Sequence, residues 1–246
     1  MTLGTKLLKV YFNFIYNLVY DFTTAQLAPY QMLQARCIDK FRFEDGEKVL
    51  CVGVGTGNEV IHILRRNGNV SIVGVDYSGT ALQKAYKKAL TFGKEIEVLN
   101  MDARSLEFAT GSFDKVTCLH VMDFIKDDRE VTNEILQVLK DGGQFVITYP
   151  SDKEGTKLGC NLLRETLRHD LNLRRHRIRV FLQFLVKIVV GSLYLPLLLR
   201  SKKRSYSRHE LEAMFTALAT SDFRIEEDAV YQDFIVYGRK STKGGQ

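Results

Sequence analysis

The sequence predicts a three-layer α/β fold in which helices cover both faces of a seven-stranded, mostly parallel sheet. Between residues 48 and 150, short apolar runs alternate with stretches of helical composition, the pattern of successive βαβ units. A glycine-rich turn follows the first apolar run, and two closely spaced apolar runs end the chain. The composition, 45% hydrophobic and 26% charged over 246 residues, is that of a globular protein.

Five apolar runs are expected to form the parallel strands, with helices in the longer intervals. The expected strands are 48–52, 70–75, 96–99, 115–119 and 144–148, and the clearest expected helices are 58–67 and 78–92. Parallel neighbours need a crossover of helical length, which these intervals supply.

The C-terminal part predicts one more helix and two antiparallel strands. Ser207 is expected to cap a helix over 207–219, with Glu210 completing a capping box. Strands at 223–229 and 233–239 lie too close together for a crossover, so they must form a hairpin.

We expect a single domain over 1–246, built of four parts along the chain. These parts are an N-terminal helical cap (1–45), a ligand-binding core (46–150), a helical insertion (151–205), and the last helix with the hairpin (206–246). Apolar residues at helical spacing predict an amphipathic helix over 3–20.

The insertion carries most of the positive charge. The whole chain has a net charge of +6, whereas 164–204 alone holds eleven Lys and Arg against two acidic residues. The apolar run 180–199 is interrupted by Lys187, whose charge disfavours a membrane-spanning helix. Two alternatives stay open: peripheral contact with an anionic membrane through 174–204, or a helical lid over a hydrophobic pocket.

The turn after the first expected strand predicts a nucleotide-binding site. Gly53, Gly55 and Gly57 flank Val54 and Thr56, and glycines at such a turn let a ligand approach the backbone and the following helix N-terminus. The G-x-G-x-G spacing is one residue tighter than the dinucleotide-binding pattern.

Two carboxylates end the next two expected strands. Asp76 lies where an acidic residue can accept the hydroxyls of a ribose, and Asp102 lies where an adenine amino group would be met. Tyr77 follows the first carboxylate and is expected to pack on the adenine.

These motifs, in this order, resemble those of class I S-adenosylmethionine (SAM)-dependent methyltransferases, of the type that includes ubiquinone/menaquinone and bacterial phospholipid methyltransferases. The resemblance covers residues 47–150 and includes Asp102-Ala103 and the lead-in Phe113-Asp114-Lys115-Val116. It implies a Rossmann-like methyltransferase fold with SAM as the cofactor. Together with the positions of Thr56, Tyr77 and His120, it gives the expected cofactor-binding residues, which are Gly53, Gly55, Thr56, Gly57, Asp76, Tyr77, Asp102, Ala103 and His120.

Two positions depart from the family pattern. Relatives usually have Asp or Glu, near the amino end of the cofactor's methionine moiety, where this chain has Cys51. A different hydrogen-bond pattern is expected at that end, with Glu59 as a substitute carboxylate the alternative. No catalytic base of the family transfers onto 121–124. The catalytic candidates are therefore His120 at the end of the fourth expected strand, Tyr206 after the insertion and Tyr20 after the first helix, with Tyr149 as a weaker candidate.

The expected function is methyl transfer from SAM to a hydrophobic small-molecule or lipid acceptor. An RNA methyltransferase using the basic insertion, a non-catalytic SAM-binding protein and a dehydrogenase-like protein are the alternatives. The four cysteines show no metal-ligand spacing, so no metal is expected, and no secretory signal is recognised. A cytoplasmic location is expected, with the inner membrane surface as the alternative that peripheral contact would give.

Overall fold

A computed structural model describes residues 21, 24, 27–126, 128–152, 158–173, 185, 204–218 and 220–242. The chain divides into two compact units. The larger combines Gln34–Glu154 with Lys202–Gln246, and the smaller combines Met1–Leu33 with Gly155–Ser201. That both belong to one domain stays a prediction.

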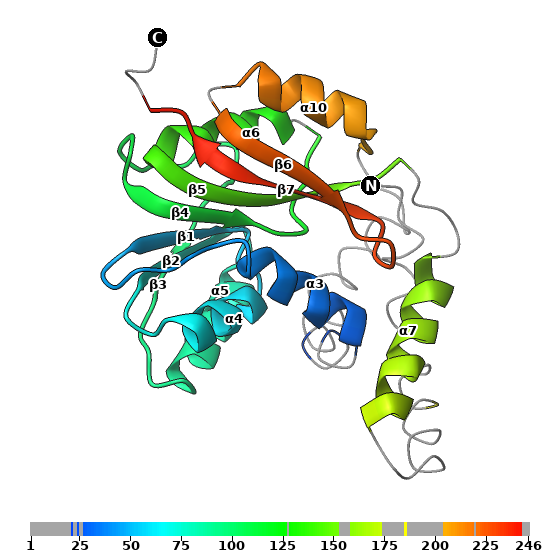
Figure 1. The fold of residues 1–246 in the computed structure, drawn as a ribbon. Helices are drawn as coiled ribbons and strands as arrows, with labels where there is room; N and C mark the ends of the chain where they lie inside the picture. Colours follow the sequence, from blue (N-terminus) through cyan, green and yellow to red (C-terminus); the bar gives the residue numbers. More distant parts are fainter. Residues whose placement is uncertain are drawn as a thin grey trace, which may run out of the picture. The chain divides into compact units, whose positions relative to one another are not determined.

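The larger unit contains a seven-stranded sheet with the strand order β3-β2-β1-β4-β5-β7-β6 (Figure 1). Neighbours among the first five strands are parallel, whereas β7 runs antiparallel to both β5 and β6. The fold and the terminal hairpin are therefore as the sequence predicts. The strands are β1 (Lys48–Val52), β2 (Ser71–Asp76), β3 (Glu97–Asn100), β4 (Phe113–Cys118), β5 (Leu139–Pro150), β6 (Thr220–Glu227) and β7 (Asp233–Lys240).

Helices cover both faces of this sheet (Figure 1). On one face lie α4 (Asn58–Arg66) and α5 (Gly79–Leu90), and on the other lie α6 (Asp128–Val138) and α10 (Arg208–Thr216). The α10 helix begins with the expected capping box of Ser207 and Glu210. A further helix, α3 (Ala28–Ile38), begins in the smaller unit and ends in the larger one.

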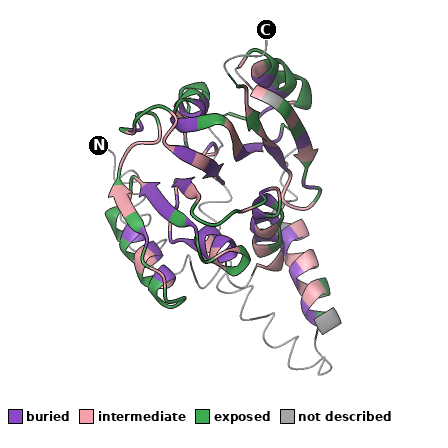
Figure 2. Cartoon of the chain, turned by 60° about the vertical axis from the view of Figure 1, so that its left-hand side comes forward, coloured by how far each residue is buried: buried purple, intermediate pink, exposed green. Residues whose placement is uncertain are grey.

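The main hydrophobic core lies between the sheet and the α6/α10 layer. It combines alternate residues of the central strands with Ile135 of α6 and Phe215 of α10. Figure 2 shows the buried residues concentrated on the central strands. Because side chains alternate along a strand, the remaining β1 and β4 side chains face the α4 layer.

Several bounds differ from the expected ones. The β5 strand begins at Leu139 instead of 144, because Gly142 and Gly143 continue the strand where glycines usually indicate a turn. The β4 strand begins at Phe113, and the side chain of Asp114 accepts a hydrogen bond from the Lys48 amide of β1. Gly142, Gly143 and Asp114 therefore belong to paired strands although they are not apolar.

In the smaller unit, α7 (Leu158–Leu173) buries Leu162, Thr166 and Asp170, which share one helix face at a spacing of four residues. It begins the predicted helical insertion. The expected helix over 3–20 and almost all of 174–203 lie outside the described residues. None of the described helices is long and apolar enough to cross a membrane.

Candidate functional site

The carboxyl ends of β1, β2 and β4 bring the predicted site residues to one edge of the sheet. Val52 pairs with Cys118 and with Val75, so the glycine turn after β1 leaves the sheet between the ends of β2 and β4. Ligands of open α/β sheets bind at this edge.

The glycine turn depends on residues without a side chain. Gly53, Gly55 and Gly57 have φ angles of 67°, 52° and 80°, a region that other residues rarely adopt. A Cβ at Gly53 would lie 2.2 Å from Val121 Cγ2, and one at Gly57 would lie 2.8 Å from Ala85 Cα. At Gly55 the nearest atom would be the Gly53 carbonyl oxygen at 3.9 Å, so Gly55 borders open space.

The helix after this turn begins without a side-chain cap. Gly57 is the N-cap of α4 and has no side chain to accept hydrogen bonds from the first-turn amides. Lys88 of α5 donates to the Asn58 side chain at 2.6 Å and contacts the hydroxyl of buried Thr56 at 3.4 Å. The Lys88 ammonium of α5 thus links the end of the glycine turn to the start of α4.

Asp76 ends β2 and is bonded to the glycine turn. Its Oδ2 accepts a hydrogen bond from the Gly55 amide at 2.8 Å, and its Oδ1 accepts one from the Ser78 amide at 2.8 Å. A carboxylate offers about four acceptor positions. Asp76 therefore retains capacity for the two ribose hydroxyls that the sequence assigns to it.

The predicted adenine contacts lie after β2 and β3. Tyr77 is 86% exposed, so its ring is available for stacking. Asp102 forms a salt bridge with Arg104 at 2.6 Å, and hydrogen bonds from Arg104 hold the pKa of Asp102 below its usual value. Ala103 packs against the hydrophobic core. A bound adenine would share Asp102 with Arg104, a contact that the sequence alone does not indicate.

His120 lies two residues beyond β4, beside the glycine turn. Its backbone has a φ of 59°, and its amide donates to Thr148 Oγ1 at 2.7 Å. The Nδ1 atom lies 3.2 Å from Oδ2 of Asp233, whose side chain is 1% exposed. The Tyr231 ring packs on the imidazole at 4.8 Å between centroids. The ring is thereby oriented by residues of the C-terminal hairpin.

Asp123 lies close to the same pair. One ligand atom from each of His120, Asp123 and Asp233 falls within 4.8 Å of the others. Imidazole and carboxylates are also donors to divalent cations, so this arrangement can serve either proton transfer or metal binding.

The two other catalytic candidates have different surroundings. Tyr206 is 1% exposed, and its hydroxyl donates to the buried Asp128 carboxylate of α6. Burial and this hydrogen bond raise the pKa of Tyr206 above its usual range, so the phenol is held in its protonated form. Tyr149 is also buried and its hydroxyl shares a hydrogen bond with Thr132 at 2.7 Å. Tyr20 lies outside the described residues.

Sequence reasoning missed the partners that the C-terminal hairpin supplies. Asp233 begins β7, and Tyr231 lies in the turn before it, where Asp228 Oδ1 accepts from the Tyr231 amide at 2.7 Å. In the sequence these residues read as an ordinary turn. Only the pairing of Pro150 with Asp233 shows that the turn reaches the end of β5, next to β4.

This strand order, with a glycine turn tied to a carboxylate at the carboxyl edge, defines a nucleotide-binding domain of the class I methyltransferase type. The family model described as "Methyltransferase domain" matches residues 49–143. Residues 49–143 therefore resemble a class I SAM-dependent methyltransferase domain, and this resemblance supports SAM as the cofactor.

Two curated relatives are similar to part of the chain, and a solved structure shares its fold. A phosphatidylethanolamine N-methyltransferase of Cereibacter sphaeroides is 34% identical over 42% of this chain and 50% of its own length. A demethylmenaquinone methyltransferase of Thermus thermophilus is 29% identical over 49% of this chain and 55% of its own length. The chain thus matches about half the length of these relatives. The fold of a SAM-dependent methyltransferase from Thermotoga maritima superposes with a TM-score of 0.61 at 14% identity, covering 92% and 98% of the two chains.

Proposed function

We propose that the protein transfers a methyl group from SAM to a hydrophobic small-molecule or lipid acceptor. The observation that carries this proposal is the His120–Asp233 pair beside the glycine turn, at the edge where open α/β sheets bind their ligands. The two curated relatives support the acceptor class, since their names specify a phospholipid and a quinone precursor.

The residues at the edge fit the cofactor. Gly55 borders open space, Asp76 has free acceptor capacity, and the first turn of α4 is uncapped by any side chain. SAM supplies an activated methyl group on a sulfonium, which leaves as a neutral thioether. The protein therefore has mainly to hold the acceptor in line with the methyl–sulfur bond and to exclude water.

His120 is proposed to take the proton that a phenol, acidic carbon or ammonium acceptor must lose. Its Nδ1 faces Asp233, which would stabilise the imidazolium and leave Nε2 as the proton acceptor. Tyr206 stays a proposed second group, acting as a hydrogen-bond donor because its phenol is held protonated. Tyr20 stays a prediction from the sequence.

The acceptor class also depends on the insertion, whose predicted roles stay proposals. The sequence of 174–204 combines apolar and basic residues, which either predicted role, a lid or a peripheral membrane contact, would use to accept a hydrophobic molecule. Either one favours a hydrophobic acceptor over nucleic acid.

The direct test incubates the protein with methyl-labelled SAM and a bacterial membrane extract. We expect label in the organic phase, and its loss in His120→Asn. Label found only in RNA or protein would contradict the proposed acceptor class. Failure to bind SAM or S-adenosylhomocysteine in calorimetry would contradict the enzymatic proposal as a whole.

A further inference from the structure

A buried carboxyl group without a compensating cation lies directly behind the glycine turn. Glu59 is the second residue of α4, and it is 3% exposed. Among the described residues, none forms a hydrogen bond of good geometry with either carboxyl oxygen, and none forms an ion pair with it. Burial of an ionised carboxylate in such surroundings is unfavourable, so the group is either protonated or paired with a cation.

The neighbours of this carboxyl come from the two central strands. Cys51 of β1 pairs with Thr117 of β4, and the thiol and hydroxyl both lie against Glu59. Burial raises the pKa of Glu59 to about 8, with a smaller opposing effect of these two contacts and a further increase from Asp76. The other titratable neighbours, Cys37 and Cys118, are neutral thiols whose pKa values are raised by burial and by Glu59.

The resemblance described above implies an acidic residue at the position that Cys51 occupies in this chain. In this chain that strand residue is a thiol, and the carboxyl in contact with it comes from the helix instead. The Glu59 carboxyl of α4 thus lies next to the β1 position at which the resemblance implies an acid.

We infer that Glu59 supplies, from α4, the carboxylate that binds the α-ammonium group of the cofactor's methionine moiety in place of the missing acid at Cys51. This inference rests on the proposed use of SAM. When the ammonium group approaches, the Glu59 carboxylic acid loses its proton to the solvent, and the resulting carboxylate pairs with the ammonium. No other bond is made or broken.

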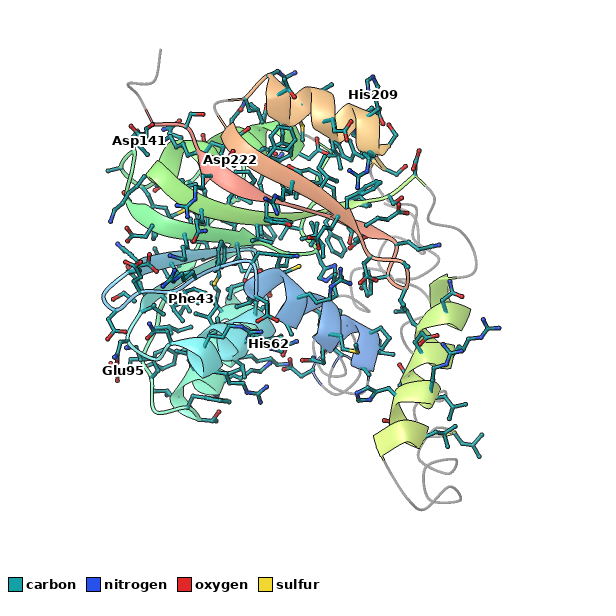
Figure 3. The ribbon with its side chains drawn as sticks, viewed as in Figure 1. Phe43, His62, Glu95, Asp141, His209 and Asp222 are labelled. Atoms are coloured by element: carbon teal, nitrogen blue, oxygen red, sulfur yellow. The ribbon has the colours of Figure 1, made fainter. Side chains whose placement is uncertain are left out.

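The test compares two ligands that differ only at this end. S-adenosylhomocysteine carries the α-ammonium group, whereas 5′-methylthioadenosine lacks the amino-acid moiety. We expect Glu59→Gln to weaken binding of S-adenosylhomocysteine by about 10- to 100-fold, the range for a hydrogen bond to a charged group, and to leave 5′-methylthioadenosine unchanged. Glu95→Gln, on the exposed loop between α5 and β3 that Figure 3 labels, is the matched control and should alter neither ligand.

Calorimetry in two buffers of different ionisation enthalpy gives a second readout. At pH 7, below the pKa of Glu59, wild-type protein should release most of a proton on binding S-adenosylhomocysteine. Glu59→Gln should abolish that release. Returning an acid to the strand, in the double variant Cys51→Glu/Glu59→Gln, should restore the ligand preference.

The outcomes separate this inference from the proposed function. Equal weakening of both ligands, or unchanged affinity and proton release in Glu59→Gln, would overturn the role of Glu59 while leaving SAM binding intact. Wild-type protein that binds neither ligand would overturn the proposed function as well. A circular dichroism spectrum of each variant confirms that it is folded.

Discussion

The Asp233 carboxylate lies 3.2 Å from Nδ1 of His120. Asp233 begins the antiparallel strand β7, whereas His120 follows the parallel strand β4, so two separate parts of the fold build this pair. The contact joins the C-terminal hairpin to the edge that carries the glycine turn. The role of the pair can therefore be tested by substituting either residue.

Asp233→Asn should lower kcat on the order of 10²-fold, because an amide cannot offset the charge of an imidazolium. The affinity for S-adenosylhomocysteine should stay the same, since Asp233 is assigned to proton transfer alone. Asp222→Asn, at an exposed position labelled in Figure 3, is the matched control. A loss of ligand affinity equal to the loss of kcat would show that Asp233 acts only through folding.

His120→Asn should remove the proton acceptor while keeping the backbone. The φ of 59° at this position is one that Asn adopts readily, so the variant should fold normally. We expect a fall in kcat of about 10²- to 10⁴-fold with an acceptor that must lose a proton. Wild-type activity should survive a chelator; its abolition by EDTA would indicate that His120, Asp123 and Asp233 bind a metal instead.

Gly55→Ala should separate ligand binding from stability. Gly55 and Gly46 both have positive φ angles, 52° and 81°. A Cβ added at Gly55 would lie 3.9 Å from its nearest neighbour, and one added at Gly46 would have no neighbour within 4 Å. Either substitution should therefore cost about 1–2 kcal/mol of unfolding free energy. Only Gly55→Ala should weaken S-adenosylhomocysteine binding. Equal affinity of the two variants would show that the space beside Gly55 is not the cofactor site.

Glu59→Gln should change the pH dependence of stability. The folded protein keeps Glu59 protonated up to about pH 8, whereas the unfolded chain ionises it near 4.5. Wild-type stability should therefore fall as pH rises between these values, by at most about 1.4 kcal/mol per pH unit. Urea unfolding at pH 5 and pH 8 should show that Glu59→Gln loses this decrease. An identical pH dependence in the variant would mean that Glu59 is ionised in the folded protein.

Tyr206→Phe should destabilise the protein by about 1.5–3 kcal/mol, because the buried Asp128 carboxylate loses a hydrogen-bond donor. Tyr237→Phe is the control: its hydroxyl donates to Glu226, which keeps its ion pair with Lys40. Urea unfolding measures both. A loss of activity in Tyr206→Phe without loss of stability would favour the catalytic role predicted from the sequence.

The sheet could be predicted because its parallel strands are buried and read as apolar runs separated by helical intervals. The bounds failed where pairing depends on something other than apolar side chains, as at Gly142 and Gly143 of β5 or Asp114 of β4. The sequence also identifies β6 and β7 as a hairpin, but its spacing alone does not say that β7 lies between β5 and β6.

The glycine turn and Asp76 could be predicted because both act through local geometry, a positive φ and a strand end. The partners of His120 could not, because they follow from the register of β7 against β5. Glu59 is an intermediate case: the sequence raises it as an alternative to an acid at Cys51, and only the structure shows that the two side chains are in contact.

The position of β7 in the sequence, after β5 and the insertion, also determines when a growing chain contains the partners of His120. A nascent chain that has reached the end of β5 holds all five parallel strands and the glycine turn, but neither Tyr231 nor Asp233. Those two residues emerge from the ribosome only after the whole insertion. The glycine turn is therefore encoded before the proposed proton-transfer pair of His120 and Asp233 is complete.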